Sequence, residues 1–158
     1  MVEITSVEPQ KKSANRRIKR FNVFLDGKFA FGADEDLVVN RRLVVGKIIP
    51  SEDLEKILFE AEVGKLMERM YRWFSLRQHS EKEVRDYFKI KNSKLKIQNG
   101  EQISSLAIES LISKLKEKGL VDDRHFAKAW VEARRKSKQK GIRAIKQELF
   151  QKGIDKEI

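Results

Sequence analysis

The sequence contains no cysteine, only two prolines and only two histidines among its 158 residues. The lack of cysteine excludes disulfides and thiolate metal sites, and no zinc site is expected because His79 and His125 lie far apart in the chain. Uninterrupted apolar runs are short, such as Leu43–Val45, which excludes a membrane-spanning helix, and the N-terminus lacks the apolar segment of a signal peptide. We therefore expect a soluble cytoplasmic protein without a metal site.

Recognisable catalytic motifs are also missing. There is no glycine-rich phosphate loop of either nucleotide-binding pattern. The acidic clusters Asp34–Asp36 and Asp122–Asp123 lie where helix N-caps are expected, so we interpret them as capping groups. His125 falls in the first turn of a predicted helix, without a nucleophile or a second histidine nearby in sequence, and is interpreted as structural. The sequence therefore predicts no enzyme, no catalytic residue and no cofactor.

What the sequence does have is positive charge, with a formal net charge of +11. Two segments hold the excess: Lys11–Arg20 carries six basic residues and Arg134–Lys146 carries seven, with no acid in either. The remainder is nearly neutral, with 22 basic against 24 acidic side chains. A strongly basic protein attracts polyanions such as nucleic acid, anionic lipid or an acidic protein surface. One block alone could be a solvated helix face, but two blocks favour a polyanionic partner.

The N-terminal third has the pattern of a small sheet with one helix. Apolar residues alternate over much of Phe21–Phe31, and Asp26-Gly27 between the two arms is typical of the type I′ turn of a β-hairpin, because both central residues need positive φ. An isolated hairpin is marginally stable, so further strands are expected. The patterns predict a strand at Val2–Val7, a mobile segment at Glu8–Arg20, a helix at Asp34–Asn40 and a strand at Leu43–Ile49.

The middle of the chain has the apolar period of amphipathic helices. Ser51 is predicted to cap the first of them, and Gly64 to weaken or break it. Ser80 and Glu83 form a capping-box pattern at the start of another helix, in which each side chain bonds the backbone N–H of the other residue. The segment Lys91–Gln102 contains Asn-Ser and Asn-Gly and is predicted to be a loop.

Two more helices are predicted near the C-terminal end. The helix before them ends at Gly119 in a Schellman-type cap, and an ending of the same kind recurs at Gly153. The apolar spacing predicts that the helix capped by Asp122 or Asp123 buries Phe126, Trp130 and Ala133, and that the helix opened by Gly141 buries Ile142, Ile145 and Leu149.

A shift of 61 residues aligns the two helical regions. The shift places helix starts and apolar positions on one another: Ser80 on Gly141, Val84 on Ile145 and Phe88 on Leu149. Coincidence is the alternative, because all amphipathic helices share a period, but the matching helix order favours tandem three-helix repeats. The second repeat then lacks a third helix in this sequence, which would leave apolar surface exposed or covered by something else.

The last predicted helix also has a cationic face. Arg143, Lys146, Gln147 and Phe150 share one side of a helical wheel, next to the apolar stripe. Cations beside an exposed aromatic side chain suit phosphate contact with stacking or packing. The alternative is that Phe150 packs against a neighbouring helix, since an aromatic at helical spacing is often core. The sequence leaves both interpretations open.

Four segments carry motifs of a known family. They are FNVFLDGKFAFGADED (Phe21–Asp36), SLRQHSEKEVRDYF (Ser75–Phe88), LISKLKEKGLVDDRHFAKAWVEARR (Leu111–Arg135) and KGIRAIKQELFQKGI (Lys140–Ile154). With these motifs the chain resembles the RecX family, bacterial regulators of the RecA recombinase, and the first segment resembles the N-terminal extension of some members. The most specific part is Gly119–Ala127 with its spacing to the last segment.

The resemblance implies a mainly α protein, with tandem three-helix repeats in an elongated array after a small N-terminal α+β subdomain that contains the β-hairpin. The expected domains are residues 1–50 as this subdomain with a mobile basic start, 51–120 as a linker helix and first repeat, and 121–158 as an incomplete second repeat. The family normally has a third repeat, so the sequence is either truncated or that of a short member. The Lys91–Gln102 loop is also longer than usual.

The resemblance further implies a non-enzymatic, monomeric, nucleoid-associated protein that lies in the groove of the RecA–DNA filament and restrains RecA in recombination, DNA repair and the SOS response. Its expected partners are the RecA filament and single- and double-stranded DNA, with no membrane and no small-molecule substrate. The alternative is a stand-alone, sequence-independent DNA-binding helical module. The residues predicted to bind RecA or DNA are basic: Arg77, Arg85, Arg134, Arg135, Lys138, Lys140, Arg143 and Lys146, with further DNA contacts at Arg16, Arg17, Lys19 and Arg20.

Overall fold

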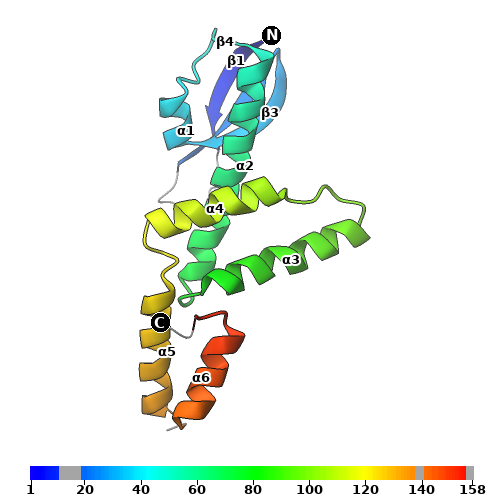
Figure 1. The fold of residues 1–158 in the computed structure, drawn as a ribbon. Coiled ribbons are helices and arrows are strands. Elements are labelled where there is room, and N and C mark those ends of the chain that lie inside the picture. The colour runs from blue at the N-terminus through cyan, green and yellow to red at the C-terminus, as the bar shows by residue number, and fades with distance from the viewer. Residues whose placement is uncertain (11–18, 138–140, 156–158) are drawn as a thin grey trace. The chain divides into compact units, whose positions relative to one another are not determined.

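A computed structural model describes residues 1–10, 19–137 and 141–155. The chain forms two compact units, Met1–Tyr71 and Arg72–Ile158. A sheet, a short helix and most of a long helix lie in the first unit, and helices make up the second (Figure 1). The prediction of a mainly helical chain that begins with a small α+β subdomain is confirmed.

The sheet of the first unit is antiparallel and has the strand order β3-β2-β1-β4. The predicted hairpin is confirmed: Asp26 and Gly27 join β2 to β3 with φ angles of 50° and 81°, as a type I′ turn requires. The bounds of the strands are Val2–Pro9 for β1, Arg20–Leu25 for β2, Lys28–Asp34 for β3 and Ile48–Ile49 for β4.

Two strand predictions need correction. Glu8, Pro9 and Arg20, which fall in the segment predicted to be mobile, belong to β1 and β2. Residues 11–18 of that segment lie outside the described residues. The strand predicted at Leu43–Ile49 is reduced to its last two residues. Positive φ angles at Arg42 and Gly46 turn the chain there, and Gly46 N–H donates to the carbonyl of Ile4 in β1.

Helix α1 (Glu35–Asn40) confirms the predicted short helix, with Asp34 as its N-cap. Helix α2 spans Ser51–Phe74 and begins one residue earlier than predicted, because the Pro50 carbonyl accepts the first helical hydrogen bond, from Leu54 N–H. The predicted break at Gly64 is wrong, since α2 continues through it. A side chain at this position would lie 3.1 Å from Asp34 Oδ2, so glycine lets α2 pass close to the α1 cap.

The second unit contains α3 (Glu81–Ile97), α4 (Ser105–Glu117), α5 (Asp123–Ser137) and α6 (Ile142–Gln151). The loop predicted at Lys91–Gln102 is wrong in its first part, because α3 continues to Ile97. No glycine or proline lies between Glu81 and Gly100, and Asn92 bonds to the backbone of Ile103 just before α4, so the helix continues through Asn92 and Ser93. The capping box at Ser80 and Glu83 is confirmed.

In the second unit, the predicted helix ends agree with the structure better than the predicted burial of side chains does. Gly119 and Gly153 both have positive φ, and the following N–H groups bond back to Leu115 and Leu149 as in a Schellman cap. Asp122 caps α5 through its bond from His125 N–H. Two residues predicted to be buried are exposed: Ala133, and Ile142 with 73% of its surface accessible.

Candidate polyanion-binding surface

The facing sides of α5 and α6 are joined by a cluster around Trp130. Its indole Nε1 donates to Glu148 Oε2 at 2.7 Å, and Arg134 Nε donates to the same oxygen at 2.9 Å. The Arg134 guanidinium also lies over the Trp130 ring, 4.8 Å from its centroid. Arg134, which the sequence assigned to binding, therefore has a structural partner in the neighbouring helix.

Three of the predicted binding residues differ from Arg134 in their surroundings. Arg135, Arg143 and Lys146 are all exposed. Within residues 1–10, 19–137 and 141–155, none of the three forms an ion pair. Their charges are therefore available to an anionic partner.

A groove of about 860 Å³ runs beside these cations between α5 and α6. Arg135 and Lys146 line it, together with apolar side chains and Asp155. Phe150 also lines the groove and keeps 68% of its surface exposed, so within the described residues it is not part of the core. The apolar lining consists of Val131, Ile142, Ile145, Leu149, Phe150 and Ile154.

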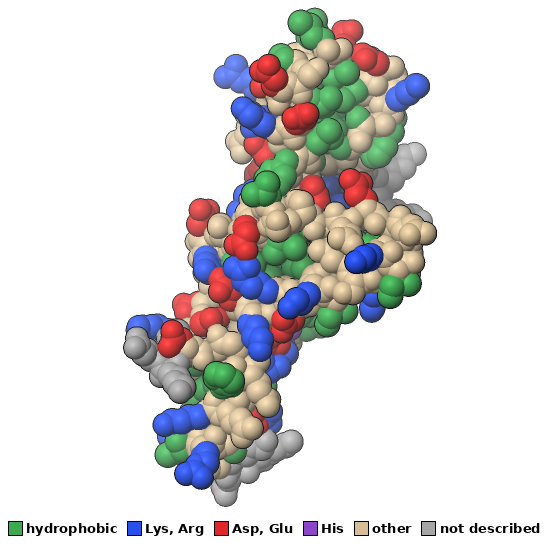
Figure 2. Space-filling model, turned by 45° about the vertical axis from the view of Figure 1, so that its right-hand side comes forward, with side chains coloured by type: hydrophobic (Ala, Val, Ile, Leu, Met, Phe, Trp, Pro, Cys, Tyr) green, Lys and Arg blue, Asp and Glu red, His purple; other side chains and the backbone are tan. Residues whose placement is uncertain are grey.

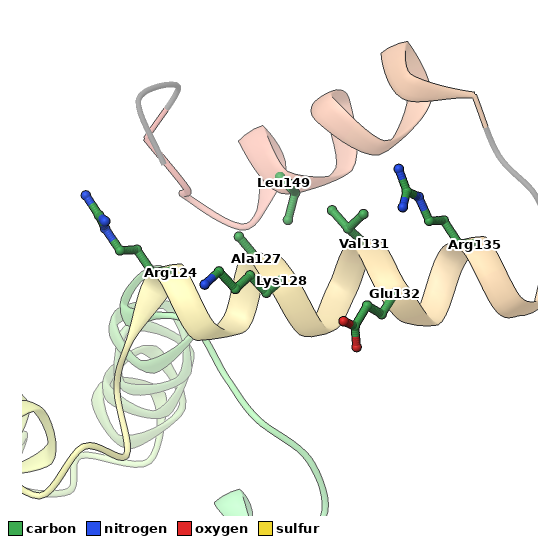
Figure 3. Close-up of a pocket in the computed structure, with 7 residues that line it drawn as sticks. All are labelled: Arg124, Ala127, Lys128, Val131, Glu132, Arg135 and Leu149. Carbon is green, nitrogen blue, oxygen red and sulfur yellow. The ribbon is translucent and has the colours of Figure 1, made fainter.

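The adjoining face of α5 carries two further cations that the sequence reasoning missed. Arg124 and Lys128 lie one turn apart on this helix and line a pocket together with Glu132 and Arg135 (Figure 3). The spacing of Arg124 and Lys128, four residues apart, indicates that both lie on one face of the helix. The prediction did not include them because it rested on segments without acidic residues, and Asp122, Asp123 and Glu132 lie in this stretch.

The binding residues predicted in the first repeat are held by acids. Arg77 donates to both carboxylate oxygens of Glu83, at 3.2 and 2.6 Å. Arg85 pairs with Glu109 on α4 and lies 3.8 Å from Glu81. Basic and acidic side chains lie intermixed on much of the visible surface (Figure 2). Pairing of this kind leaves Arg77 and Arg85 less available to a partner than Arg143 and Lys146.

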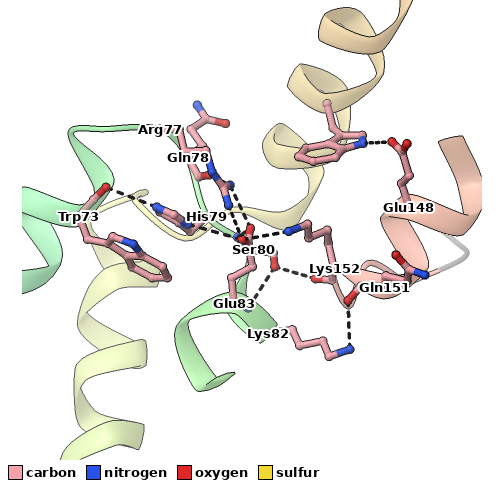
Figure 4. Close-up of polar contacts among 11 residues, drawn as sticks. Trp73, Arg77, Gln78, His79, Ser80, Lys82, Glu83, Glu148, Gln151 and Lys152 are labelled. Carbon is pink, nitrogen blue, oxygen red and sulfur yellow. Dashed lines mark hydrogen bonds and ion pairs between the residues drawn. The ribbon is translucent and has the colours of Figure 1, made fainter. Parts of the chain in front are cut away.

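Glu83 is the centre of a polar network at the start of α3 (Figure 4). Burial acts to raise the pKa of its carboxyl, but hydrogen bonds from Arg77 and Ser80 N–H and the charges of Arg77 and Lys152 outweigh burial and lower the pKa to about 2. His79 lies beside it, stacked on Trp73 at 3.5 Å between ring centroids. Burial, and then the charge of Arg77, lower the pKa of His79.

Of the N-terminal basic residues predicted to contact DNA, the structure describes Lys19 and Arg20, and these two differ in burial. Arg20 is buried and pairs with the buried Glu68 at 3.1 Å, so its charge is compensated inside the first unit. Lys19 is exposed. The other predicted positions, Arg16, Arg17, Lys138 and Lys140, lie outside the described residues.

The described residues contain neither a metal-binding cluster nor a membrane-spanning helix. No group of three or more His, Asp or Glu side chains there could hold a metal ion. None of the helices in that part of the chain has the length and apolar character needed to cross a membrane.

Two family models match the chain. The model described as Regulatory protein RecX N-terminal domain matches residues 2–50, and the model described as RecX, second three-helix domain, matches residues 122–158. The second match covers α5, α6 and the groove between them.

Curated relatives named Regulatory protein RecX match over nearly the whole chain. The protein of Listeria monocytogenes serotype 4b (strain F2365) is 30% identical over 99% of this chain and 53% of the relative. Those of Bacillus velezensis and Bacillus pumilus are 35% and 36% identical, over 96% and 98% of this chain and 52% and 54% of the relatives. The chain thus spans about half the length of the curated relatives it matches.

A solved structure described as a crystal structure of regulatory protein RecX has the same fold. It is 28% identical, with a TM-score of 0.72 over 99% of this chain and 70% of the solved one.

Proposed function

We propose that this chain, which belongs to the RecX family, regulates RecA by binding the RecA–DNA filament and restraining its ATP hydrolysis and strand exchange. The family membership carries the regulatory part of the proposal, since the relatives are named regulatory proteins. The partner and the direction of the effect come from the family resemblance. Such a protein would act as a monomer on single- and double-stranded DNA filaments in the cytoplasm, at the nucleoid.

One observation in the second unit carries the choice of surface. Arg135, Arg143 and Lys146 are exposed without ion pairs among the described residues, whereas Arg77, Arg85 and Arg134 are paired with Glu83, Glu109 and Glu148. A partner that binds the first three gains charge contacts without breaking internal ones. We therefore place the main contact on α5 and α6.

The same surface suits both components of a nucleoprotein filament. Exposed guanidinium and ammonium groups can neutralise phosphates or acidic side chains. The exposed Phe150 can add stacking on a base or apolar contact with a protein. A filament presents phosphates and protein side chains together, which favours it over either component alone.

A triple substitution tests the surface. In R135A/R143A/K146A, the slope of log affinity for the filament against log salt should become shallower by about 3 if each cation neutralises a phosphate. The matched control is K89A/K94A/K96A, which removes three exposed lysines from α3 and lowers the net charge equally. Equal losses of affinity in the two variants would refute the assignment to α5 and α6, because the effect would then follow net charge alone.

The alternative function is a stand-alone DNA-binding module, suggested by the two consecutive helices α5 and α6 with their basic residues. The measurement is RecA-dependent ATP hydrolysis with DNA in large excess over both proteins. Filament regulation predicts inhibition at concentrations that coat little bare DNA. Inhibition that disappears in excess DNA would instead follow from sequestration of DNA and would refute filament regulation.

A further inference from the structure

The start of α3 is bonded to the end of α6, although the two segments lie about seventy positions apart in sequence. The last carbonyls of a helix have no partner within it. Here Ser80 Oγ donates to the Lys152 carbonyl at 2.6 Å, and Lys82 Nζ donates to the Gln151 carbonyl at 3.0 Å (Figure 4). Side chains of α3 thus satisfy the C-terminal end of α6.

Charged groups strengthen the same contact. Lys152 Nζ lies 3.4 Å from Glu83 Oε2, and Asp123 Oδ1 of α5 accepts from Glu81 N–H at 3.1 Å. The positive end of the α3 dipole therefore meets both the negative end of α6 and an acid at the start of α5, which is an electrostatically favourable arrangement. Ser80 is fully buried in it.

Gly153 shows how close this contact is. A Cβ atom added there would overlap Lys82 Cβ and lie 2.8 Å from Lys82 Cδ. Gly119, at the same position of the α4 cap, also has positive φ, but a Cβ there would meet nothing within 4 Å. The α6 ending is therefore closed against α3 to a degree that the α4 ending is not.

We infer that these residues form a joint that fixes the α5–α6 pair on α3 and so sets the position of its exposed cations relative to the first repeat. We define the α3–α6 joint as Ser80, Lys82, Glu83, Gln151, Lys152 and Gly153. They are positioning residues, since their polar groups are bonded within the chain. The inference rests on the proposed function only for its consequence, because a contact surface held in one orientation loses less conformational freedom on binding than one that is attached loosely.

Glycine substitutions with a matched control test the joint. The chain has no cysteine, so spin labels can be attached at K89C on α3 and A144C on α6, both exposed positions, and their distance measured by pulsed electron resonance. G153A should shift or broaden the distance distribution. G119A carries the same positive-φ strain without the overlap and should keep the parental distribution.

A second variant covers the case in which G153A does not fold. K82A removes the ammonium contact with the Gln151 carbonyl and the methylenes beside Gly153 from an exposed side chain and should broaden the distribution. Unchanged distributions in G153A and K82A, or in K82A alone if G153A is unfolded, would overturn the joint. In filament binding, G153A should lose affinity by about tenfold relative to G119A, because a loosely held surface must be ordered on binding. If the unsubstituted protein does not bind a filament, the proposed function is refuted. The distances between the spin labels would still test whether the α3–α6 joint fixes the position of α6.

Discussion

Replacing Glu83 with glutamine should destabilise the protein in a pH-dependent way. The pKa of Glu83 falls from the ordinary value of 4.5 to about 2 in the folded protein, which corresponds to about 3 kcal/mol of stability at neutral pH. Glutamine can still accept the bond from Ser80 N–H in a capping box, but it loses the charge that faces Arg77 and Lys152. We therefore expect a loss of about 1–3 kcal/mol at pH 7.

The pH dependence follows from the direction of the shift. Because the folded-state pKa is depressed, the charged carboxylate stabilises the fold fully above pH 4.5, and this contribution is lost as the pH falls toward 2. The gap in stability between the parent and E83Q should therefore narrow between these values. Urea unfolding followed by the fluorescence of Trp73 and Trp130 measures the gap at each pH.

Glu109 provides the control for Glu83. It also pairs with an arginine, Arg85, but its side chain is 58% exposed against 13% for Glu83, and exposed pairs are screened by solvent. E109Q should therefore lose less stability than E83Q at pH 7. A stability of E83Q equal to that of the parent at pH 7, or a gap that does not change with pH, would refute the assigned role of Glu83.

Two further predictions concern substitutions that change a single charge. Arg20→Ala should destabilise the first unit by about 3–5 kcal/mol in thermal or urea unfolding, because it leaves the buried Glu68 without its partner; R20L/E68L should be less harmful, and a neutral effect of R20A would contradict the buried pair. Ile142→Glu places a carboxylate one turn before Lys146 at an exposed position, where it can pair with that lysine. It should weaken filament binding while the melting temperature stays unchanged, and an unchanged affinity would show that Lys146 does not contribute.

The sequence predicted the local features of the fold well. Asp26-Gly27 specifies the turn of the hairpin because few residues adopt positive φ at two consecutive positions. Ser80 with Glu83, and Gly119 with Leu120, specify helix ends because their hydrogen bonds close within a few residues. Each of these signals is complete within a short segment, so no tertiary information was needed.

The errors arose where tertiary contacts decide. Asn-Ser in the middle of α3 has loop propensity, yet Asn92 bonds to both backbone groups of Ile103 across the helix pair, which holds this stretch as a helix. Gly64 lowers helix propensity, but close passage past Asp34 favours it within α2. Ile142 has the spacing of a core residue and is exposed. Periodicity alone cannot report what lies opposite a helix face.

The charge of the candidate surface was visible in the sequence, but its availability was not. Arg85 is paired with an acid 24 residues away and Arg134 with one 14 residues away. Both acids lie on a neighbouring helix, so their effect depends on packing. A count of basic residues therefore predicts attraction to a polyanion. The ion pairs within the folded protein determine which of those residues are available to bind it.

The 61-residue shift allows the pairing of basic residues to be compared between the two helical regions. It matches basic residues near the starts of α3 and α6: Lys82 with Arg143, and Arg85 with Lys146. In α3 both members are engaged, Lys82 with the Gln151 carbonyl and Arg85 with Glu109. In α6 their counterparts are exposed and, within the described residues, form no ion pair.

The acids at the start of α3 have no counterpart in α6, and this difference suits the two helix starts to different contacts. Glu81 and Glu83 correspond to Ile142 and Ala144. With the acids present, the start of α3 can hold cations from its own helix and from the end of α6, as Glu83 does with Lys152. Without them, the start of α6 keeps its positive charge for other contacts. One helix start is thus suited to joining the repeats, and the other to meeting an anionic partner.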